Sequence, residues 1–391
     1  MVSQAVIELG KKNTDCGTLK DLAPDIEKKS FLSYLVWNLA RQGITDIVLI
    51  INEEYIGLNR LKAKEFLGTK INVIKALGSE KLLSSLELNK NILQERFWLL
   101  SGDAFSDCPY RDIVVEHRLS EEIIVHGTMK DPIGKFEEMY FDSNFYVTPT
   151  NNQNNYYKTI YNTGVYLLNK KILNYTNKEN LSLDRDKFSY LIKNKKLKLF
   201  ITESFLAKNE TLKCDSPSKK EFFNFICRPA LFLDRDGTIN IDNGYTHKLS
   251  DLELIDGAAK TIKYATSKGF YIVIITNQGG VSLGKFSVKD MHLFNNALVE
   301  KFRDSGANVD YVYYCIHHPD AKNERYKHCD CRKPKPGMIL KAFDELPIIK
   351  EKSIMIGDKD IDVAAANNAG IKGYKFEGTN LLDFISQKKI L

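Results

Sequence analysis

Short apolar runs that stop abruptly at a polar residue recur along this chain, and they limit the folds open to it. In the first half, residues 5–9, 46–51 and 97–103 have the composition of buried strands. Residues 30–43 have the apolar period of a helix that Gly43 ends. This alternation of strand and helix predicts a mostly parallel sheet that is covered on both faces.

The same rhythm restarts near residue 227. The apolar runs ALFL, YIVIIT and SIMIG lead directly to Asp234, Thr276 and Asp358, with Thr276 closing its own run. In a doubly wound sheet, residues at the carboxyl ends of parallel strands line the ligand crevice. The 391 residues are enough for two separate cores. We therefore predict two doubly wound, Rossmann-like α/β domains, formed by residues 1–226 and 227–391.

Charge and hydropathy exclude two classes of partner. The 56 Lys and Arg residues are interleaved with 50 Asp and Glu residues, so the net charge of +6 forms no concentrated basic patch of the kind that binds nucleic acid. The N-terminal residues form no cleavable hydrophobic stretch, and no apolar run approaches the roughly 18 residues that cross a bilayer. We expect a cytoplasmic protein with no nucleic-acid or membrane partner.

Asp234 and Asp236 form the pattern DxDGT directly after a predicted strand. Two carboxylates at this spacing can divide the work of phosphoryl transfer, because one can attack phosphorus while the other exchanges a proton with the leaving oxygen and with water. Asp358 would complete an oxygen site for Mg²⁺. The Thr276 hydroxyl and the Lys333 ammonium could then bind the phosphate.

Three of the seven cysteines cluster with histidines between residues 315 and 331, whereas the other four are scattered singly. The pairs Cys315-x-His317 and Cys329-x-Cys331 offer one nitrogen and three sulfurs, which suit a closed tetrahedral Zn²⁺ site. An ion with four protein ligands stabilises a fold and performs no chemistry. Such a zinc would hold Arg332 and Lys333 at the predicted crevice.

The segments DRDGTIN, TNQGG, CRKPKPG and GDKDID, in this order, resemble the four motifs of the haloacid dehalogenase superfamily of phosphatases. Residues 230–378 are similar above all to the D-glycero-D-manno-heptose 1,7-bisphosphate 7-phosphatases and to their histidinol-phosphatase relatives. The resemblance implies a haloacid dehalogenase-like domain with a minimal cap and a zinc loop. It implies the following roles: Asp234 as nucleophile, Asp236 as general acid and base, Thr276 and Lys333 as phosphate binders, Asn277, Gln278 and Arg332 as substrate contacts, and Asp358 as a magnesium ligand together with Asp234 and the Asp236 carbonyl.

This resemblance predicts a Mg²⁺-dependent phosphatase that removes the 7-phosphate of a heptose 1,7-bisphosphate through an aspartyl phosphate, in the synthesis of an activated sugar. The alternative substrate is histidinol phosphate. One departure from the family is visible, because Leu283 lies near the place where the family commonly has an arginine that touches substrate. The loss of a guanidinium weakens recognition of a second phosphate.

Residues 4–225 resemble sugar-phosphate nucleotidyltransferases, through segments such as LLSGDAF (99–105) and NTGVYLLNKKIL (162–173). The resemblance implies a metal site at Asp103 and Asp215. Leu19 stands where active members have an arginine that faces the triphosphate. We therefore expect a degenerate domain that binds a sugar phosphate, or serves as an assembly surface. The alternative is a bifunctional enzyme whose first domain binds a nucleoside triphosphate or nucleotide sugar and still transfers a nucleotide.

Overall fold

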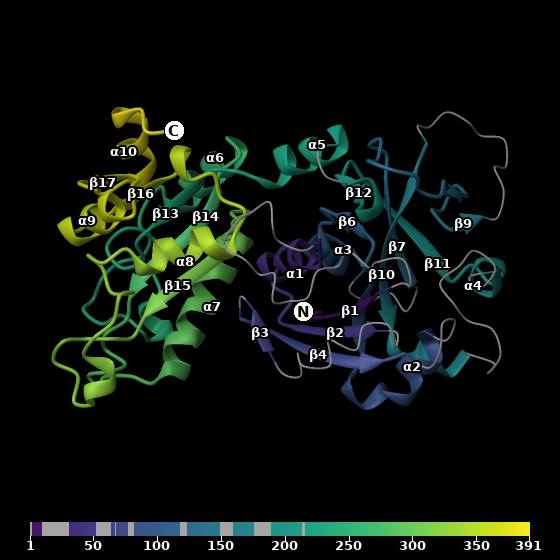
Figure 1. Ribbon diagram of the computed structural model, residues 1–391, viewed down its shortest axis with the longest axis horizontal. Helices are drawn as coiled ribbons and strands as arrows, with labels where there is room; N and C mark the ends of the chain where they lie inside the picture. The colour runs from purple at the N-terminus through teal and green to yellow at the C-terminus, as the bar shows by residue number, and fades with distance from the viewer. Residues whose placement is uncertain are drawn as a thin grey trace. The chain divides into compact units, whose positions relative to one another are not determined.

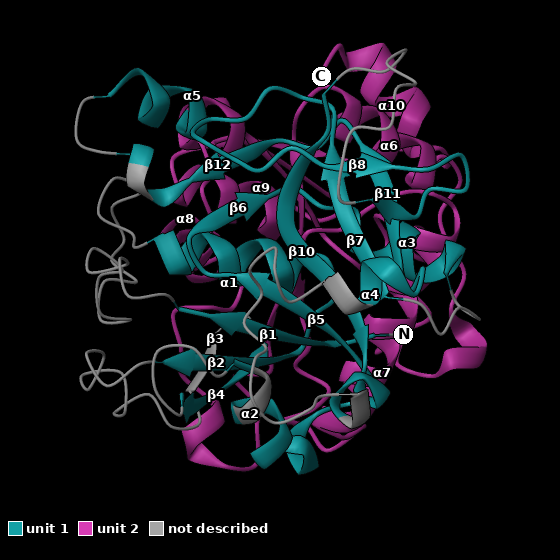
Figure 2. Cartoon of the chain, turned by 90° about the vertical axis from the view of Figure 1, so that its right-hand side faces the viewer, with its two compact units in different colours: residues 1–23, 27–223 teal, residues 24–26, 224–391 magenta. Residues whose placement is uncertain are grey.

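The computed structural model forms two compact units, one of residues 1–23 and 27–223 and the other of residues 24–26 and 224–391 (Figure 2). Residue 226 is the last residue of α5 (Pro217–Ile226), and the domain boundary there stays a prediction. The structure describes residues 2–9, 31–51, 64–66, 68–76, 82–117, 123–148, 159–175, 189–212 and 216–391.

The first unit contains an eight-stranded sheet with the order β11-β7-β10-β5-β1-β2-β4-β3 (Figure 1). Strand β10 runs antiparallel to both of its neighbours and β3 runs antiparallel to β4, whereas the other pairs are parallel. The sheet is therefore mostly parallel, as predicted. Its strands are β1 (Gln4–Glu8), β2 (Asp46–Ile51), β3 (Lys64–Phe66), β4 (Thr69–Lys75), β5 (Arg96–Ser101), β7 (Ile123–Thr128), β10 (Tyr161–Asn169) and β11 (Leu197–Thr202).

Helices and two small ribbons accompany this sheet. The helices are α1 (Phe31–Arg41), α2 (Leu82–Leu88), α3 (Tyr110–Glu116), α4 (Ser189–Lys193) and α5, with 3-10 turns η4 (Lys90–Ile92), η5 (Lys170–Tyr175) and η6 (Asn209–Thr211). The antiparallel ribbons pair β6 (Ala104–Ser106) with β12 (Leu206–Lys208), and β8 (Tyr140–Phe141) with β9 (Val147–Thr148). The predicted helix at 30–43 is confirmed as α1, and Gly43 follows it with φ of 89°.

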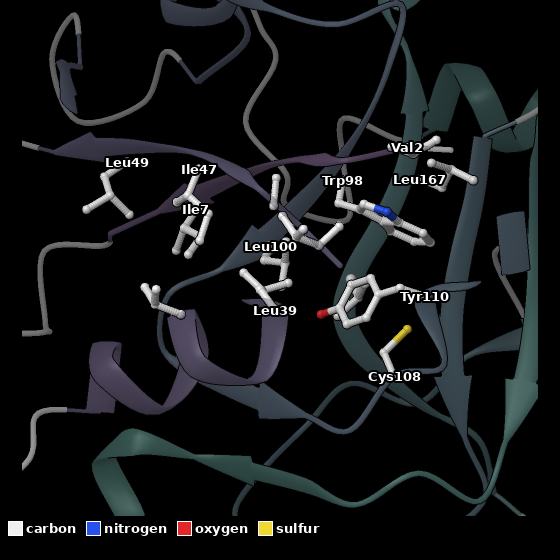
Figure 3. Close-up of a cluster of buried hydrophobic side chains, with 14 of the residues drawn as sticks. Val2, Ile7, Leu39, Ile47, Leu49, Trp98, Leu100, Cys108, Tyr110 and Leu167 are labelled. Atoms are coloured by element: carbon white, nitrogen blue, oxygen red, sulfur yellow. The ribbon is translucent and has the colours of Figure 1, made fainter. Parts of the chain in front are cut away.

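Both faces of the first sheet are buried. In β1, Ala5 and Ile7 belong to one apolar cluster and Val6 belongs to another, because successive side chains of a strand point to opposite faces. Figure 3 shows part of the first cluster, in which Trp98 meets Tyr110 edge to face with ring centroids 4.8 Å apart. The predicted cover on both faces is therefore confirmed.

The second unit contains a five-stranded parallel sheet with the order β15-β14-β13-β16-β17 (Figure 1). The strand order reverses between β13 and β16, which is where doubly wound sheets bind ligands. The strands are β13 (Ala230–Leu233), β14 (Tyr271–Asn277), β15 (Tyr311–Cys315), β16 (Ile354–Gly357) and β17 (Lys372–Lys375). The helices are α6 (Ala258–Ser267), α7 (Val288–Asp304), α8 (Gly337–Glu345), α9 (Asp360–Asn368) and α10 (Leu381–Lys388), with 3-10 turns η7 (Leu249–Asp251), η8 (Glu324–Tyr326) and η9 (Lys350–Lys352).

Strand β13 is the centre of this sheet and is buried on both faces. Leu231 and Leu233 belong to a cluster that also contains side chains of α6, α7 and α10. Phe232 points to the opposite face and meets Phe343 of α8 edge to face, with ring centroids 5.6 Å apart. Two layers of helices therefore fix the strand that leads to Asp234.

Among the described residues, no helix combines the length and the apolar character that a bilayer crossing requires. The cytoplasmic location stays a prediction.

One histidine is enclosed in the first sheet. His126 in β7 has no exposed surface, and its Nδ1 and Nε2 atoms lie 2.9 Å from Thr163 Oγ1 and 2.7 Å from Thr202 Oγ1. Burial disfavours the charged ring and lowers the pKa of His126 to about 3. The folded state thus holds a neutral imidazole at pH values where the unfolded chain would bind a proton.

This difference predicts that acid destabilises the first unit. The contribution of His126 to the free energy of unfolding is complete above the unfolded pKa of about 6.5. It falls by about 1.4 kcal/mol per pH unit as the pH drops toward the folded pKa of about 3. Both tryptophans, Trp37 and Trp98, lie in this unit, so urea unfolding followed by tryptophan fluorescence measures its stability. Between pH 7.5 and 5.0, the wild type should lose about 2 kcal/mol more than His126→Gln. Equal losses in both proteins would contradict the assignment.

Candidate functional site

Three strand ends meet at one edge of the second sheet. Strand β13 ends at Leu233 and pairs in parallel with β14 on one side and with β16 on the other. Asp234 follows β13, Asp358 follows β16, and Thr276 is the second-to-last residue of β14. The parallel register therefore brings these side chains to the same edge, at the place where the strand order reverses.

A buried lysine lies between two buried carboxylates at this edge. Lys333 is 3% exposed, and its Nζ atom lies 2.6 Å from Asp234 Oδ1 and 2.6 Å from Asp362 Oδ1. The same ammonium donates to the Ile275 carbonyl oxygen at 3.0 Å. Three oxygen atoms of the protein thus surround the Lys333 ammonium group.

Burial and charge pairing act in opposite directions on these groups. Burial raises the pKa of Asp234 to about 7, although Lys333 counteracts it. Burial acts to lower the pKa of Lys333, but the carboxylates of Asp234 and Asp362 outweigh it and raise that pKa above its ordinary value. Lys333 therefore remains a cation, and it is the group that favours an ionised Asp234.

Asp236 is held by four hydrogen bonds. Its Oδ1 atom accepts from Arg235 Nε and from Asn240 Nδ2, both at 3.0 Å. Its Oδ2 atom accepts from Arg235 Nη2 at 2.7 Å and from Gln278 Nε2 at 3.1 Å. These bonds hold the carboxyl group in one orientation, with 16% of the Asp236 side chain exposed.

Gly237 is required by the turn that follows Asp236. Its φ is 85°, in the left-handed region that favours glycine. A Cβ atom at this position would also lie 2.7 Å from the carboxylate carbon of Asp358. The glycine of DxDGT thus lets the loop approach the aspartate that follows β16.

The residues of TNQ connect the site to its surroundings. Gln278 Nε2 donates to Thr276 Oγ1 at 2.8 Å as well as to Asp236, so Gln278 links two of the predicted site residues. Asn277 Nδ2 donates to the Lys333 carbonyl oxygen and Asn277 Oδ1 accepts from the Lys333 amide, both at 3.1 Å. The Asn277 side chain, predicted to contact substrate, is thus engaged by the backbone of Lys333.

The residues at this edge fit a hard divalent cation. Carboxylate oxygens of Asp234, Asp358 and Asp362 lie within 4.8 Å of one another. Asp358 Oδ1 is buried and has no hydrogen-bond partner in the part of the chain that the structure describes. These three carboxyl groups together offer the oxygen ligands that Mg²⁺ prefers.

The predicted Cys and His ligands gather in one cluster. Cys315 Sγ lies 3.7 Å from Cys329 Sγ and 3.6 Å from His317 Nδ1, and Cys331 Sγ lies 3.5 Å from His317 Nδ1. Tetrahedral zinc would separate two sulfurs by about 3.7 Å and a sulfur from a nitrogen by about 3.6 Å. Cys331 and Cys315 are closer, at 2.9 Å, yet too far apart for a disulfide.

Arg332 joins this cluster to the site. Its Nη1 atom donates to the His317 carbonyl oxygen at 3.1 Å, and a Cβ atom placed on Gly279 would lie 3.1 Å from the same Nη1. Arg332 is therefore tied to the Cys/His loop on one side and borders the loop after TNQ on the other.

In the first unit, Asp103 follows the end of β5. Gly102 allows the close approach there, since a Cβ atom would lie 2.8 Å from the Glu8 carbonyl oxygen. Asp103 accepts a hydrogen bond from Ser101 Oγ, and its Oδ2 atom lies 3.8 Å from Lys208 Nζ. Asp215, the other predicted ligand, lies outside the described residues, as does Leu19.

Two residues of the site were missed by the sequence analysis. Asp362 belongs to the motif GDKDID, but the motif contains three aspartates and the spacing alone does not say which of them faces Lys333. The structure separates them, because Asp362 is fully buried whereas the Asp360 side chain is 87% exposed. Arg235 occupies the variable position of DxD, and only its placement between two predicted catalytic residues could have drawn attention to it.

Comparison with protein-family models identifies both parts of the chain. Residues 16–202 match the nucleotidyl transferase model, and residues 330–375 match the HAD-hydrolase-like model.

The second unit also has close relatives. The D-glycero-beta-D-manno-heptose-1,7-bisphosphate 7-phosphatase of Photorhabdus laumondii is 46% identical over 144 residues, which are 37% of this chain and 77% of that protein. The enzyme of the same name from Escherichia coli K12 is 43% identical over 147 residues, again 37% of this chain and 77% of that protein.

A solved structure of a D,D-heptose 1,7-bisphosphate phosphatase from B. bronchiseptica, complexed with magnesium and phosphate, is 27% identical, with a TM-score of 0.34. The match covers 41% of this chain and 86% of that one. The two curated relatives are more than 40% identical to this chain, and the match spans 77% of each of them. The chain therefore belongs, through its second unit, to the D-glycero-β-D-manno-heptose-1,7-bisphosphate 7-phosphatase family of HAD-like hydrolases, and a nucleotidyl transferase domain precedes that unit.

Proposed function

We propose that the second unit hydrolyses a phosphate monoester and that its substrate is a heptose 1,7-bisphosphate, from which it removes the 7-phosphate. The observation that carries the proposal is the 2.6 Å contact between Lys333 Nζ and Asp234 Oδ1 in a site that also contains Asp236 and Asp358. A carboxylate beside a fixed cation is able to meet an anionic phosphate, because the ammonium attracts the phosphoryl oxygens. The names of the relatives supply the sugar.

In the first step, an Asp234 oxygen attacks the phosphorus atom. The bond between phosphorus and the ester oxygen breaks as the Asp236 carboxyl group gives its proton to that oxygen, so the sugar leaves as an alcohol. Asp234 then carries the phosphoryl group as an aspartyl phosphate, and Asp236 is left as a carboxylate.

In the second step, Asp236 acts as a base. It takes a proton from a water molecule whose oxygen attacks the phosphorus atom, and the bond to Asp234 breaks. The products are inorganic phosphate and a regenerated Asp234 carboxylate. Asp236 is again protonated and ready for the next substrate.

We assign Mg²⁺ to Asp234, Asp358 and the Asp236 carbonyl oxygen. When bound, the ion supplies positive charge that lets the Asp234 carboxylate approach the substrate phosphate. The unpartnered buried Oδ1 atom of Asp358 supports this assignment. The Thr276 hydroxyl and Lys333 would hold the phosphoryl oxygens, with Gln278 and Arg332 near the substrate and Asn277 acting on the Lys333 backbone.

We assign a structural Zn²⁺ to Cys315, His317, Cys329 and Cys331. Three of the four separations, at 3.5–3.7 Å, support a tetrahedral site, whereas Cys315 and Cys331, whose sulfurs lie 2.9 Å apart, would have to separate around the ion. Four protein ligands leave no position for substrate. Through the bond from Arg332 to the His317 carbonyl, this ion would also fix a substrate contact.

We infer that the first unit transfers nucleotides poorly. The sequence has Leu19 in place of the arginine that active members direct at the triphosphate. In addition, the Lys208 ammonium lies 3.8 Å from Asp103 and competes with a divalent cation for that carboxylate. The domain would then bind a sugar phosphate, or serve as an assembly surface. We keep the cytoplasm as the proposed location.

Replacement of Asp234 by Asn should abolish phosphate release from heptose 1,7-bisphosphate, with kcat reduced by more than about 1,000-fold, because the amide cannot act as the nucleophile. Colorimetric assay of inorganic phosphate measures the loss. The matched control is Asp360→Asn, which changes an exposed aspartate of GDKDID whose partner is Lys375. Activity near the wild-type level in Asp234→Asn, or a comparable loss in the control, would refute the assigned nucleophile.

Replacement of Cys329 by Ser should lower both the zinc content and the melting temperature, because a weaker ligand replaces a thiolate and the loop depends on the metal. Metal analysis after dialysis against a chelator gives the content per chain. His328→Gln is the control, since that neighbouring side chain is 89% exposed and should leave the zinc content unchanged. Purified wild-type protein without zinc, or full zinc content in Cys329→Ser, would contradict the assignment.

The first unit can be tested without interference from the second. In an Asp234→Asn background, each nucleoside triphosphate is incubated with Mg²⁺ and a panel of sugar 1-phosphates, and pyrophosphate release is measured. We expect release no faster than in the double variant that also carries Asp103→Asn, because the triphosphate charge is poorly countered. Pyrophosphate release that disappears with Asp103→Asn would establish a bifunctional enzyme instead.

A further inference from the structure

Arg235 separates the two aspartates of DxD, and it is one of the largest fully buried side chains in the described part of the molecule, with 1% exposure. Burial of a guanidinium removes its hydration, which is unfavourable unless the group is paired and hydrogen-bonded. The proposed mechanism assigns no step to this residue. The contacts that compensate its burial therefore indicate what it does.

Two of its contacts go to Asp236. Arg235 Nε donates to Oδ1 at 3.0 Å, and Nη2 donates to Oδ2 at 2.7 Å. These parallel bonds join the planar guanidinium to both oxygens of the carboxyl group. Because this arrangement fixes direction as well as distance, the plane of Asp236 is set by the plane of Arg235.

Other groups fix the guanidinium itself. Arg235 Nη1 donates to Asn295 Oδ1 at 2.8 Å, and Nη2 donates to the Thr246 carbonyl oxygen at 2.7 Å. Its central carbon lies 4.7 Å from the centre of the Phe294 ring. Phe294 and Asn295 are on α7 and are buried, so the helix and the loop at Thr246 hold the arginine from two directions.

We propose that Arg235 is a positioning residue that aims Asp236 at the ester oxygen of the substrate. This rests on the proposed function, in which Asp236 gives its proton to that oxygen. The orientation of Asp236 therefore depends on one buried guanidinium group, which Asn295 on α7 holds in place. Neither residue needs to touch the substrate.

Substrates with different leaving groups test this role. The alcohol that leaves from heptose 1,7-bisphosphate needs a proton, whereas the phenolate that leaves from p-nitrophenyl phosphate does not. The value of kcat/KM covers the steps up to departure of the leaving group. A misaimed Asp236 should therefore reduce kcat/KM for the sugar phosphate much more than for the aryl phosphate.

The variants are Arg235→Met, Arg235→Lys and Asn295→Ala. For Arg235→Met we expect a loss of about 100-fold with the sugar phosphate and less than about 3-fold with the aryl phosphate, within the range that general acid catalysis contributes. Arg235→Lys keeps the charge but cannot form the paired bonds, so the selective loss should persist. Asn295→Ala keeps the paired bonds but removes their anchor, and a smaller selective loss of about 10-fold is expected.

Arg303→Met is the matched control. Arg303 is also on α7, where it pairs with Glu300, and the variant should keep the wild-type ratio of the two kcat/KM values. Should Arg235→Met fail to fold, as judged by its melting curve, the other two variants decide the question. Equal losses with both substrates, or a wild-type ratio in Arg235→Lys, would overturn the proposal.

Failure of the proposed function has a different signature. In that case wild-type protein would release no phosphate from heptose 1,7-bisphosphate, or Asp236→Asn would turn over both substrates as the wild type does. If Asp236→Asn shows the selective loss and the Arg235 and Asn295 variants do not, the catalytic assignment stands and only the positioning role fails.

Discussion

The site depends on one arrangement of buried charges, in which the Lys333 ammonium lies between Asp234 and Asp362. Burial disfavours the charged form of Asp234 and raises its pKa, and the Lys333 cation counteracts this effect. The three acceptors around Lys333 are Asp234 after β13, Ile275 within β14 and Asp362 on α9, so the lysine ties together three separate segments of the second unit. Ordering a lysine side chain costs about 2 kcal/mol of conformational entropy, and Lys333 is already ordered in the folded protein before any substrate binds.

Around this pair, the fold separates the two aspartates of DxD into different environments. Asp234 points toward the lysine and the proposed metal ligands, whereas Asp236 is turned toward Arg235, Asn240 and Gln278. The turn at Gly237 makes this possible, because it lets the backbone approach Asp358 while reversing direction. Two identical side chains two positions apart can thus serve as nucleophile and as acid and base in the proposed mechanism.

Sequence patterns predicted the strands well where burial dictates composition. The runs at 46–51 and 230–233 are β2 and β13 to the residue. The antiparallel direction of β10 could not be predicted, because a strand buried on both faces reads the same in either direction. The gathering of Asp234, Thr276 and Asp358 followed from their positions at strand ends. Asp362 and Arg235 could not be found in this way, since their importance comes from contacts with residues distant in the chain, such as Lys333 and Asn295.

Strand β13 has neighbours that are far away in the sequence, since Leu231 pairs with Ile272 on one side and with Ile354 on the other. Contacts of such long range have an entropic cost, because a large loop must close before they can be made. On the ribosome, Asp234 is made well before β16, the strand that completes its surroundings. The first sheet is complete once β11 has been synthesised, so the preceding unit has the opportunity to fold while the residues of β16 are still to be added.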